Sequence, residues 1–236
     1  MEKTLLLISG GIDSIGALAW AHDKFECEAL FIDYGWLSNK YEYEAARKYC
    51  MQLNVPLNAV PLQGLDDATP RNAPPIGSLV LHSIAIYNAL ALRCRSHIYP
   101  IHSWDVICHP DDPSRLQADR EYINRVEDLV TCGLNIDYDI LTPFIHVPKY
   151  EIIDLLRLSG ICASATVSCS RPSHNGHCGV CTACVERKVA FQMSSVRDQT
   201  RYIDKSNFTL SDLIGKKQEY FDIKTHSVIQ PSKNVH

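Results

Sequence analysis

Six residues near the start of the chain, Ser9-Gly10-Gly11-Ile12-Asp13-Ser14, join an apolar run to a segment with a helical pattern. Glycines let the backbone approach a ligand closely, and the first turn of a helix offers free N–H groups and the positive end of its dipole. The hydroxyls of Ser9 and Ser14 add donors on either side. The stretch therefore indicates an anion site suited to phosphate. The alternative is a plain glycine turn in which Asp13 caps the helix.

A second group of reactive side chains lies further along the chain. Four cysteines follow the spacing Cys-x8-Cys-x2-Cys-x2-Cys: Cys169, Cys178, Cys181 and Cys184. Four soft thiolates this close together predict a closed tetrahedral site, the pattern of structural zinc. The tight triplet also suits an iron–sulfur cluster, and His174 or His177 in the same loop could replace one thiolate. A closed site leaves no position for water, so we expect it to hold the loop against the ligand-binding edge of the fold.

The elements that must position these residues alternate along the chain. Strand patterns cover residues 4–9, 29–33, 57–62, 97–101 and 139–142. Helical patterns cover residues 13–24, 40–53, 76–94, 117–130, 148–159 and 185–195. This alternation predicts an α/β fold, a Rossmann-like parallel sheet with helices on both faces. We expect one domain over residues 1–195, including a metal loop at 162–187, and a C-terminal extension over 196–236.

Composition narrows the class of protein. The chain has 23 Lys and Arg against 27 Asp and Glu, a formal net charge of -4. Nucleic acid is therefore a disfavoured partner, since phosphate neutralisation needs a basic surface. No apolar run is long enough to span a bilayer, and the first one ends at glycines rather than at a signal-peptide cleavage site. We expect a soluble, cytoplasmic protein with no membrane partner; a homodimer stays open.

The order of the motifs carries a family resemblance. Ser9–Ser14 resembles the Ser-Gly-Gly-x-Asp-Ser pyrophosphate loop of the PP-loop ATP pyrophosphatases, and its pairing with the cysteine cluster is similar to the 7-cyano-7-deazaguanine synthase family, QueC. Further landmarks follow in the family's order between Leu5 and about Phe191: Asp33-Tyr34-Gly35, Glu44-Ala45-Ala46, Arg71-Asn72, Asp105, His109-Pro110-Asp111, Thr142-Pro143, Lys149, Ser168-Cys169 and Arg187.

The resemblance implies an ATP-dependent carbon–nitrogen ligase that acts on a 7-carboxy-7-deazaguanine. The substrate carboxylate attacks the α-phosphate of ATP, pyrophosphate leaves, and ammonia converts the adenylate to an amide. A second ATP then activates the amide, which collapses to the nitrile. ATP, Mg²⁺ and Zn²⁺ are the implied cofactors, and the implied partners are the small-molecule 7-deazaguanine and ammonia.

The resemblance also gives residues expected roles. Lys149 would neutralise phosphate charge, and Asp13 would orient the loop or a Mg²⁺ ion; these two are the expected catalytic residues. The residues expected to contact ATP are Ser9, Gly10, Gly11, Asp13, Ser14, Asp33, Tyr34 and Gly35. Arg71 would pair with the substrate carboxylate, while Asp105 and Asp111 would bind its guanine-like edge. The two aspartates could equally be solvated loop acids, and Lys149 an exposed first-turn lysine. Zinc would be held by the four cysteines.

Two departures from the family pattern fall at the ligand-facing edge. Trp36-Leu37-Ser38 stands where the family carries Gln and a basic or His residue, and the segment 100–104 replaces a glycine-rich strand end. Arg115 or Arg120 could take the position of a family Arg. Such changes could alter which nucleophile reaches the adenylate. The rival functions are a QueC-like antiphage-defence enzyme that joins the deazaguanine carboxylate to a protein amine, a tRNA sulfur transferase, and a non-catalytic nucleotide-binding subunit.

Overall fold

The computed structural model describes residues 1–62, 77–107 and 119–213. Five parallel strands form a sheet in the order β3-β2-β1-β4-β5. The strands are β1 Lys3–Leu7, β2 Glu26–Asp33, β3 Leu57–Pro61, β4 Ser96–Ile98 and β5 Asp139–Leu141. The helices are α1 Ile12–Ala21, α2 Asn39–Gln52, α4 Gly77–Ala91, α5 Ser103–Ile107, α6 Arg120–Leu134, α7 Lys149–Leu158 and α8 Thr182–Met193, with a 3₁₀ turn, η2, at Ala163–Ala165.

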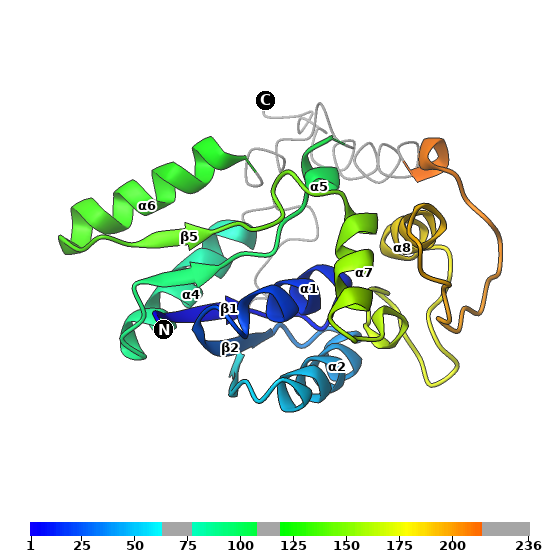
Figure 1. Cartoon of the computed structure of the whole chain (residues 1–236), viewed down its shortest axis with the longest axis horizontal. Helices are drawn as coiled ribbons and strands as arrows, with labels where there is room; N and C mark the ends of the chain where they lie inside the picture. The colour runs from blue at the N-terminus through cyan, green and yellow to red at the C-terminus, as the bar shows by residue number, and fades with distance from the viewer. Residues whose placement is uncertain (63–76, 108–118, 214–236) are drawn as a thin grey trace, which may run out of the picture.

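Helices cover both faces of the sheet (Figure 1). Because successive side chains of a strand point to opposite faces, Leu6 of β1 joins one hydrophobic core while Leu5 and Leu7 join the other. The first core packs against α1, α2, α7 and α8, and the second against α4 and α6. The prediction of a Rossmann-like parallel sheet with helices on both faces is confirmed.

The order of the strands places the ligand-binding edge. The chain runs outward from β1 through β2 to β3, and then returns to the other side of β1 for β4 and β5. The direction of winding therefore changes between β1 and β4. In open parallel sheets, ligands bind outside the carboxyl ends of the strands at such a switch point. The loop after β1 and the segment after β4 flank it.

Two elements near this edge differ from the sequence-based expectation. The helix α5 was not expected, because five residues are too few to show a helical period. The helix α8 starts at Thr182, three residues before the expected start at Val185, and Cys181 is its N-cap. Cys184 therefore stands in the first turn of a helix rather than in the irregular loop.

The segment after α8 returns to the cysteine loop. The backbone N–H of Ile203 donates to the carbonyl of His177 at 2.9 Å, and the N–H of Asp204 donates to the carbonyl of Cys178 at 3.1 Å. The buried ammonium of Lys188 donates to three carbonyls, those of Gly179, Asp204 and Ser206, at 2.9, 2.9 and 2.8 Å. The boundary expected at residue 195 stays a prediction, and these hydrogen bonds cross it.

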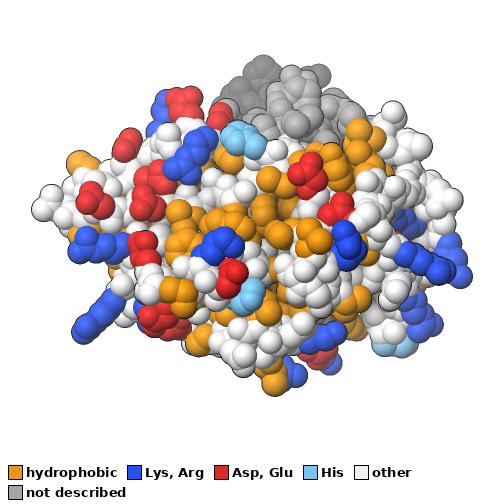
Figure 2. Space-filling view, in the orientation of Figure 1, with side chains coloured by type: hydrophobic (Ala, Val, Ile, Leu, Met, Phe, Trp, Pro, Cys, Tyr) orange, Lys and Arg blue, Asp and Glu red, His pale blue; other side chains and the backbone are white. Residues whose placement is uncertain are grey.

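The charge on the surface and the length of the helices bear on whether the protein binds nucleic acid or crosses a membrane. On the face drawn in Figure 2, basic and acidic side chains are interspersed rather than gathered into a patch of one sign. Among the described helices, none combines the length and the apolar character that crossing a lipid bilayer requires.

Candidate nucleotide and metal sites

The glycine loop after β1 has a conformation that other residues could not adopt. Gly10 has φ of 77°, and a Cβ atom at this position would lie 2.2 Å from the carbonyl oxygen of Glu42. Gly11 is the N-cap of α1, so the alternative that Asp13 caps the helix is wrong. The hydroxyl of Ser14 accepts from the backbone N–H and the hydroxyl of Ser9, at 3.1 and 3.2 Å. The loop is thereby closed on itself, with the N–H groups of the first turn of α1 at the switch point.

Five ionisable side chains meet beside this loop, and we refer to them as the charged cluster: Asp13, His102, Asp105, Lys149 and Glu186. They come from α1, the turn after β4, α5, α7 and α8 respectively. The Lys149 ammonium lies 2.9 Å from Asp13 Oδ2 and 3.4 Å from Glu186 Oε1. Lys149 is 6% exposed, so the alternative of an ordinary exposed lysine is wrong.

The imidazole of His102 completes the charged cluster. Its Nε2 lies 3.2 Å from Glu186 Oε1, 3.5 Å from Asp105 Oδ2, and 3.7 Å from Asp13 Oδ1. Burial and the nearby Lys149 ammonium lower the pKa of His102, but the carboxylates of Asp105 and Asp13 and a hydrogen bond to Glu186 outweigh them, so the pKa is raised. Burial likewise opposes the charge on Lys149, and the same carboxylates raise its pKa.

Sequence reasoning found three members of the charged cluster and missed two. His102 lies in the segment 100–104, and the departure of this segment from the family pattern was the only feature of the sequence that drew attention to this histidine. Glu186 lies two residues after Cys184, and no sequence motif marks it as a site residue. The structure brings Asp105 into the cluster, with its Oδ2 accepting from the His102 backbone N–H at 3.0 Å. The other candidates, Arg71, Asp111 and Arg115, lie outside the described residues; Arg120 contacts β5 and Glu127 on α6.

The turn after β2 forms a second part of the edge. Asp33 Oδ1 accepts from the N–H of Gly35 at 2.9 Å and from the amide of Asn39. The ring of Tyr34 stacks on that of Trp36, with centroids 4.8 Å apart. A cavity of about 370 Å³ opens here. Its lining residues are Phe31, Asp33, Gly35, Trp36, Asn39, Lys40, Tyr43 and Ala59. Asp33 and Gly35, two of the residues that the sequence predicts to contact ATP, thus line this cavity.

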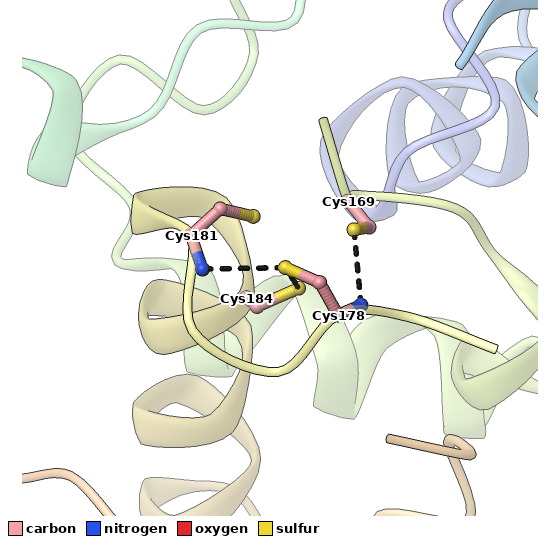
Figure 3. Close-up of side chains that lie close together, drawn as sticks. All are labelled: Cys169, Cys178, Cys181 and Cys184. Carbon is pink, nitrogen blue, oxygen red and sulfur yellow. Dashed lines mark hydrogen bonds between the residues drawn. The ribbon is translucent and has the colours of Figure 1, made fainter. Parts of the chain in front are cut away.

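The four cysteines gather as predicted (Figure 3). Their sulfur atoms all lie within 4.8 Å of one another, and the sulfurs of Cys178 and Cys184 are 3.9 Å apart. Zinc–sulfur bonds of about 2.3 Å in a tetrahedron put sulfurs roughly 3.8 Å apart. Two backbone N–H groups donate to Cys169 Sγ, those of Arg171 and Cys178, at 3.3 and 3.2 Å. The donor set therefore fits a metal with four soft ligands.

The thiols and the nearby histidine support the same set of ligands. Hydrogen bonds among three of the thiols lower the pKa of Cys181 and raise the pKa of Cys169 and Cys184, so without a metal the cluster favours a thiolate at Cys181. The ring of His177 instead packs edge-on against Tyr202, with centroids 5.9 Å apart. The residues brought together are thus the four cysteines, without a histidine.

Buried hydrogen bonds connect the cysteine loop to the glycine loop. Arg187, fully buried on α8, donates to the hydroxyls of Thr166 and Ser168 at 2.7 and 3.1 Å. The N–H of Val167 in turn donates to the carbonyl of Gly10 at 2.9 Å. The cysteine loop is therefore linked to the glycine loop at the switch point by hydrogen bonds; that a metal holds it there stays a prediction.

The parallel sheet, the Ser-Gly-Gly loop at its switch point and the buried lysine beside it define a PP-loop α/β fold. The chain belongs to the QueC family: the family model described as "Queuosine biosynthesis protein QueC" matches residues 3–73 and 65–195. The resemblance inferred from the order of the motifs is confirmed.

Individual relatives agree with this assignment. The chain is 32% identical to a 7-cyano-7-deazaguanine synthase of Coxiella burnetii, over 87% of this chain and 100% of that protein. It is 30% identical to a 7-cyano-7-deazaguanine synthase of Saccharophagus degradans, over 85% of this chain and 98% of that protein. The NMN synthetase of Francisella tularensis has the same fold, with a TM-score of 0.57 at 10% identity over 100% of this chain and 90% of that one.

Proposed function

We propose that this protein is an ATP-dependent carbon–nitrogen ligase that adenylates the carboxylate of a 7-carboxy-7-deazaguanine and aminates it to the amide and then the nitrile. The full-length match to relatives named 7-cyano-7-deazaguanine synthase supports the substrate class. The observation that carries the proposal is the buried Lys149 ammonium, 2.9 Å from Asp13 in the first turn of α1.

In the first half-reaction a carboxylate oxygen attacks the α-phosphorus of ATP. The bond from that phosphorus to the bridging oxygen breaks, and pyrophosphate leaves with its electron pair. The N–H groups of Gly10 and Gly11 and the hydroxyls of Ser9 and Ser14 would hold the pyrophosphate. Lys149 would stabilise the negative charge that grows on the leaving group. Asp13 keeps the ammonium in place and would orient the loop or the Mg²⁺ ion bound to the phosphates.

In the second half-reaction the lone pair of ammonia attacks the acyl carbon. The bond between the acyl carbon and the oxygen of AMP breaks, and AMP leaves with its electron pair. A proton is released, and the amide remains. With a second ATP, the amide oxygen is adenylated and departs in AMP while two protons are lost, which gives the nitrile. Asp105 would bind the guanine-like edge together with Asp111, through the carboxylate oxygen that does not contact His102, and Arg71 would pair with the carboxylate of the substrate.

The remaining parts of the edge have supporting roles. The cavity after β2, where Asp33, Tyr34 and Gly35 form the turn, would take the adenosine of ATP. Zinc, when bound by the four cysteines, supplies a tetrahedral cross-link that holds the start of α8. That helix carries Glu186 into the charged cluster, so the cross-link acts on the geometry around Lys149.

A single reaction mixture tests the proposal. Purified protein is incubated with ATP, Mg²⁺, 7-carboxy-7-deazaguanine and ammonium, and AMP, pyrophosphate and the product mass are measured. We expect AMP and pyrophosphate in equal amounts and the nitrile as product. Absence of substrate-dependent AMP would refute the proposed function. A deazaguanine joined to a protein amine, seen when a protein acceptor replaces ammonia, would instead identify the defence-type chemistry.

A further inference from the structure

The charged cluster holds more negative than positive charge. The carboxylates of Asp13, Asp105 and Glu186 contribute three negative charges, and Lys149 contributes one positive charge. Over these described residues the sum is therefore -2 with a neutral His102 and -1 with a protonated one. Glu186 and His102 are 7% and 2% exposed, whereas the side chains of Asp13 and Asp105 are 22% and 38% exposed, so bulk water compensates least of the charge at Glu186. Buried charge is costly unless it is neutralised. A divalent cation bound in place of the Nε2 proton would bring this sum to zero.

The spacing of the potential ligands suits such an ion. His102 Nε2 lies 3.2 Å from Glu186 Oε1 and 3.5 Å from Asp105 Oδ2, and the three ligand atoms all lie within 4.8 Å of one another. Metal bonds of about 2.0 to 2.1 Å to nitrogen and oxygen place neighbouring tetrahedral ligands roughly 3.3 Å apart. The distances from His102 Nε2 to Glu186 Oε1 and to Asp105 Oδ2, 3.2 and 3.5 Å, are close to this value.

An unpartnered carboxylate oxygen lies at the same place. Asp13 Oδ1 is buried, lies 3.7 Å from His102 Nε2, and has no hydrogen-bond partner among the described residues. His102 Nδ1 is also buried without a partner in that part of the chain, so the contacts that orient the ring are those of Nε2. Nε2 therefore faces three carboxylate oxygens and the Lys149 ammonium, which lies 3.4 Å away. One of these oxygens, Asp13 Oδ1, is available to bind a cation.

We propose that His102, Asp105 and Glu186 bind a first-row divalent metal ion, with Asp13 Oδ1 as a fourth ligand, at a site separate from the four cysteines. One imidazole nitrogen with carboxylate oxygens suits Mn²⁺ or Zn²⁺ better than Mg²⁺ or Ca²⁺, which prefer oxygen alone. The ion would sit between the glycine loop and Lys149. A part in binding the phosphates of ATP rests on the proposed function, but the binding of the metal does not.

Mn²⁺ alone is the probe that tests this site, because it prefers nitrogen and oxygen ligands to thiolates. Protein whose cysteine site is filled with Zn²⁺ is titrated with Mn²⁺ without nucleotide, and the bound ion is followed by electron paramagnetic resonance. We expect one bound Mn²⁺ per chain with a magnetic coupling to an imidazole nitrogen. His102→Asn should abolish that coupling and weaken binding by about tenfold or more, and Glu186→Gln should weaken it similarly.

Matched variants make the outcome specific. His146→Asn and Glu151→Gln change exposed residues outside the charged cluster, and both should leave the Mn²⁺ Kd within about twofold. Asp105→Asn is the second ligand variant if Glu186→Gln fails to fold. Binding that is equal in wild type and His102→Asn, or bound Mn²⁺ without nitrogen coupling, would overturn the proposal. AMP formation is measured separately, so the metal site and the ligase function can fail independently.

Discussion

Two buried histidines five residues apart in the chain, His97 in β4 and His102 after it, have opposite electrostatic surroundings. His97 belongs to a neutral cluster with His82 and Tyr138: its Nε2 lies 2.9 Å from His82 Nδ1, and its Nδ1 lies 2.9 Å from the Tyr138 hydroxyl. Burial lowers the pKa of His82 to about 4 and that of His97 well below its ordinary value. In the charged cluster, by contrast, the pKa of His102 is raised.

The difference teaches that neighbours rather than depth decide the charge of a buried histidine. Both rings are at most 2% exposed, so desolvation acts on both. Three carboxylates surround His102, whereas an imidazole and a phenol surround His97. The carboxylates favour positive charge at the position of Nε2, whether a proton or a metal ion supplies it. The neutral cluster lies between α4 and the sheet, and the charged cluster lies at the carboxyl edge where the ligand site is expected.

The largest effect should come from removing the central charge of the charged cluster. Lys149→Met should lower substrate-dependent AMP formation by about 10²- to 10³-fold, since a buried cation that stabilises a developing charge is lost. Initial rates of pyrophosphate release measure this. Lys24→Met, which changes a half-exposed lysine in the turn after α1, is the control and should keep wild-type rates. A rate for Lys149→Met within a few-fold of wild type would contradict its catalytic role.

A cysteine variant should affect the charged cluster and leave the neutral cluster unchanged. Cys184→Ser removes one of the four proposed metal ligands, in the first turn of α8, the helix that brings Glu186 to Lys149. We expect loss of bound metal and a decrease in the free energy of unfolding of about 3 to 5 kcal/mol. Metal analysis and urea unfolding measure these changes. Cys132→Ser, at an exposed cysteine of α6, should change neither, and NMR signals of His82 and His97 should move little in both variants.

The neutral cluster should respond to acid. The pKa of His82 in the folded protein, about 4, lies below its ordinary value of 6.5, so the unfolded chain takes up the proton first. Stability from this group is therefore complete above about pH 6.5 and is lost as the pH falls toward 4, by about 3 kcal/mol in all.

Urea unfolding between about pH 7 and pH 4 measures this loss. The variant His82→Gln cannot bind the proton, so its stability should fall less steeply over the same range. His146→Gln changes an exposed histidine and should keep the wild-type profile. Identical profiles for wild type and His82→Gln would show that His82 is not held neutral by burial.

The smallest effect should come from the end of the neutral cluster. Tyr138→Phe removes the hydroxyl that pairs with His97 Nδ1 and should lower the free energy of unfolding by about 1 to 2 kcal/mol. AMP formation should stay at the wild-type rate, because the hydrogen bonds of the neutral cluster join His82, His97 and Tyr138 to one another and not to the glycine loop. Tyr87→Phe, at a tyrosine that is 76% exposed, should change the unfolding free energy by less than about 0.5 kcal/mol.

The residues that sequence reasoning identified correctly belong to local patterns. The Ser-Gly-Gly loop and the cysteine spacing are each legible within a few positions, because the glycine conformation and the tetrahedral geometry impose fixed spacings. The alternation of strand and helix patterns was enough for the parallel sheet. The ATP and substrate roles of individual residues remain proposals.

What the sequence did not reveal depends on contacts between distant segments. His102 and Glu186 are 84 positions apart (186 less 102), and neither stands in a pattern that marks it as part of a site. The tertiary fold alone brings α8 against the turn after β4. The short helix α5 and the early start of α8 were missed for a different reason, because their turns are shorter than the window over which a helical period can be recognised.

The hydrogen bonds of Lys188 have a consequence for the order in which the protein matures during synthesis. All four cysteines are made before the segment that supplies the carbonyls of Asp204 and Ser206. Until that segment has left the ribosome, the Lys188 ammonium lacks two of its three acceptors, and the cysteine loop lacks its backbone pairing. The metal loop therefore reaches its final form late in translation, after the sheet that it serves has been made.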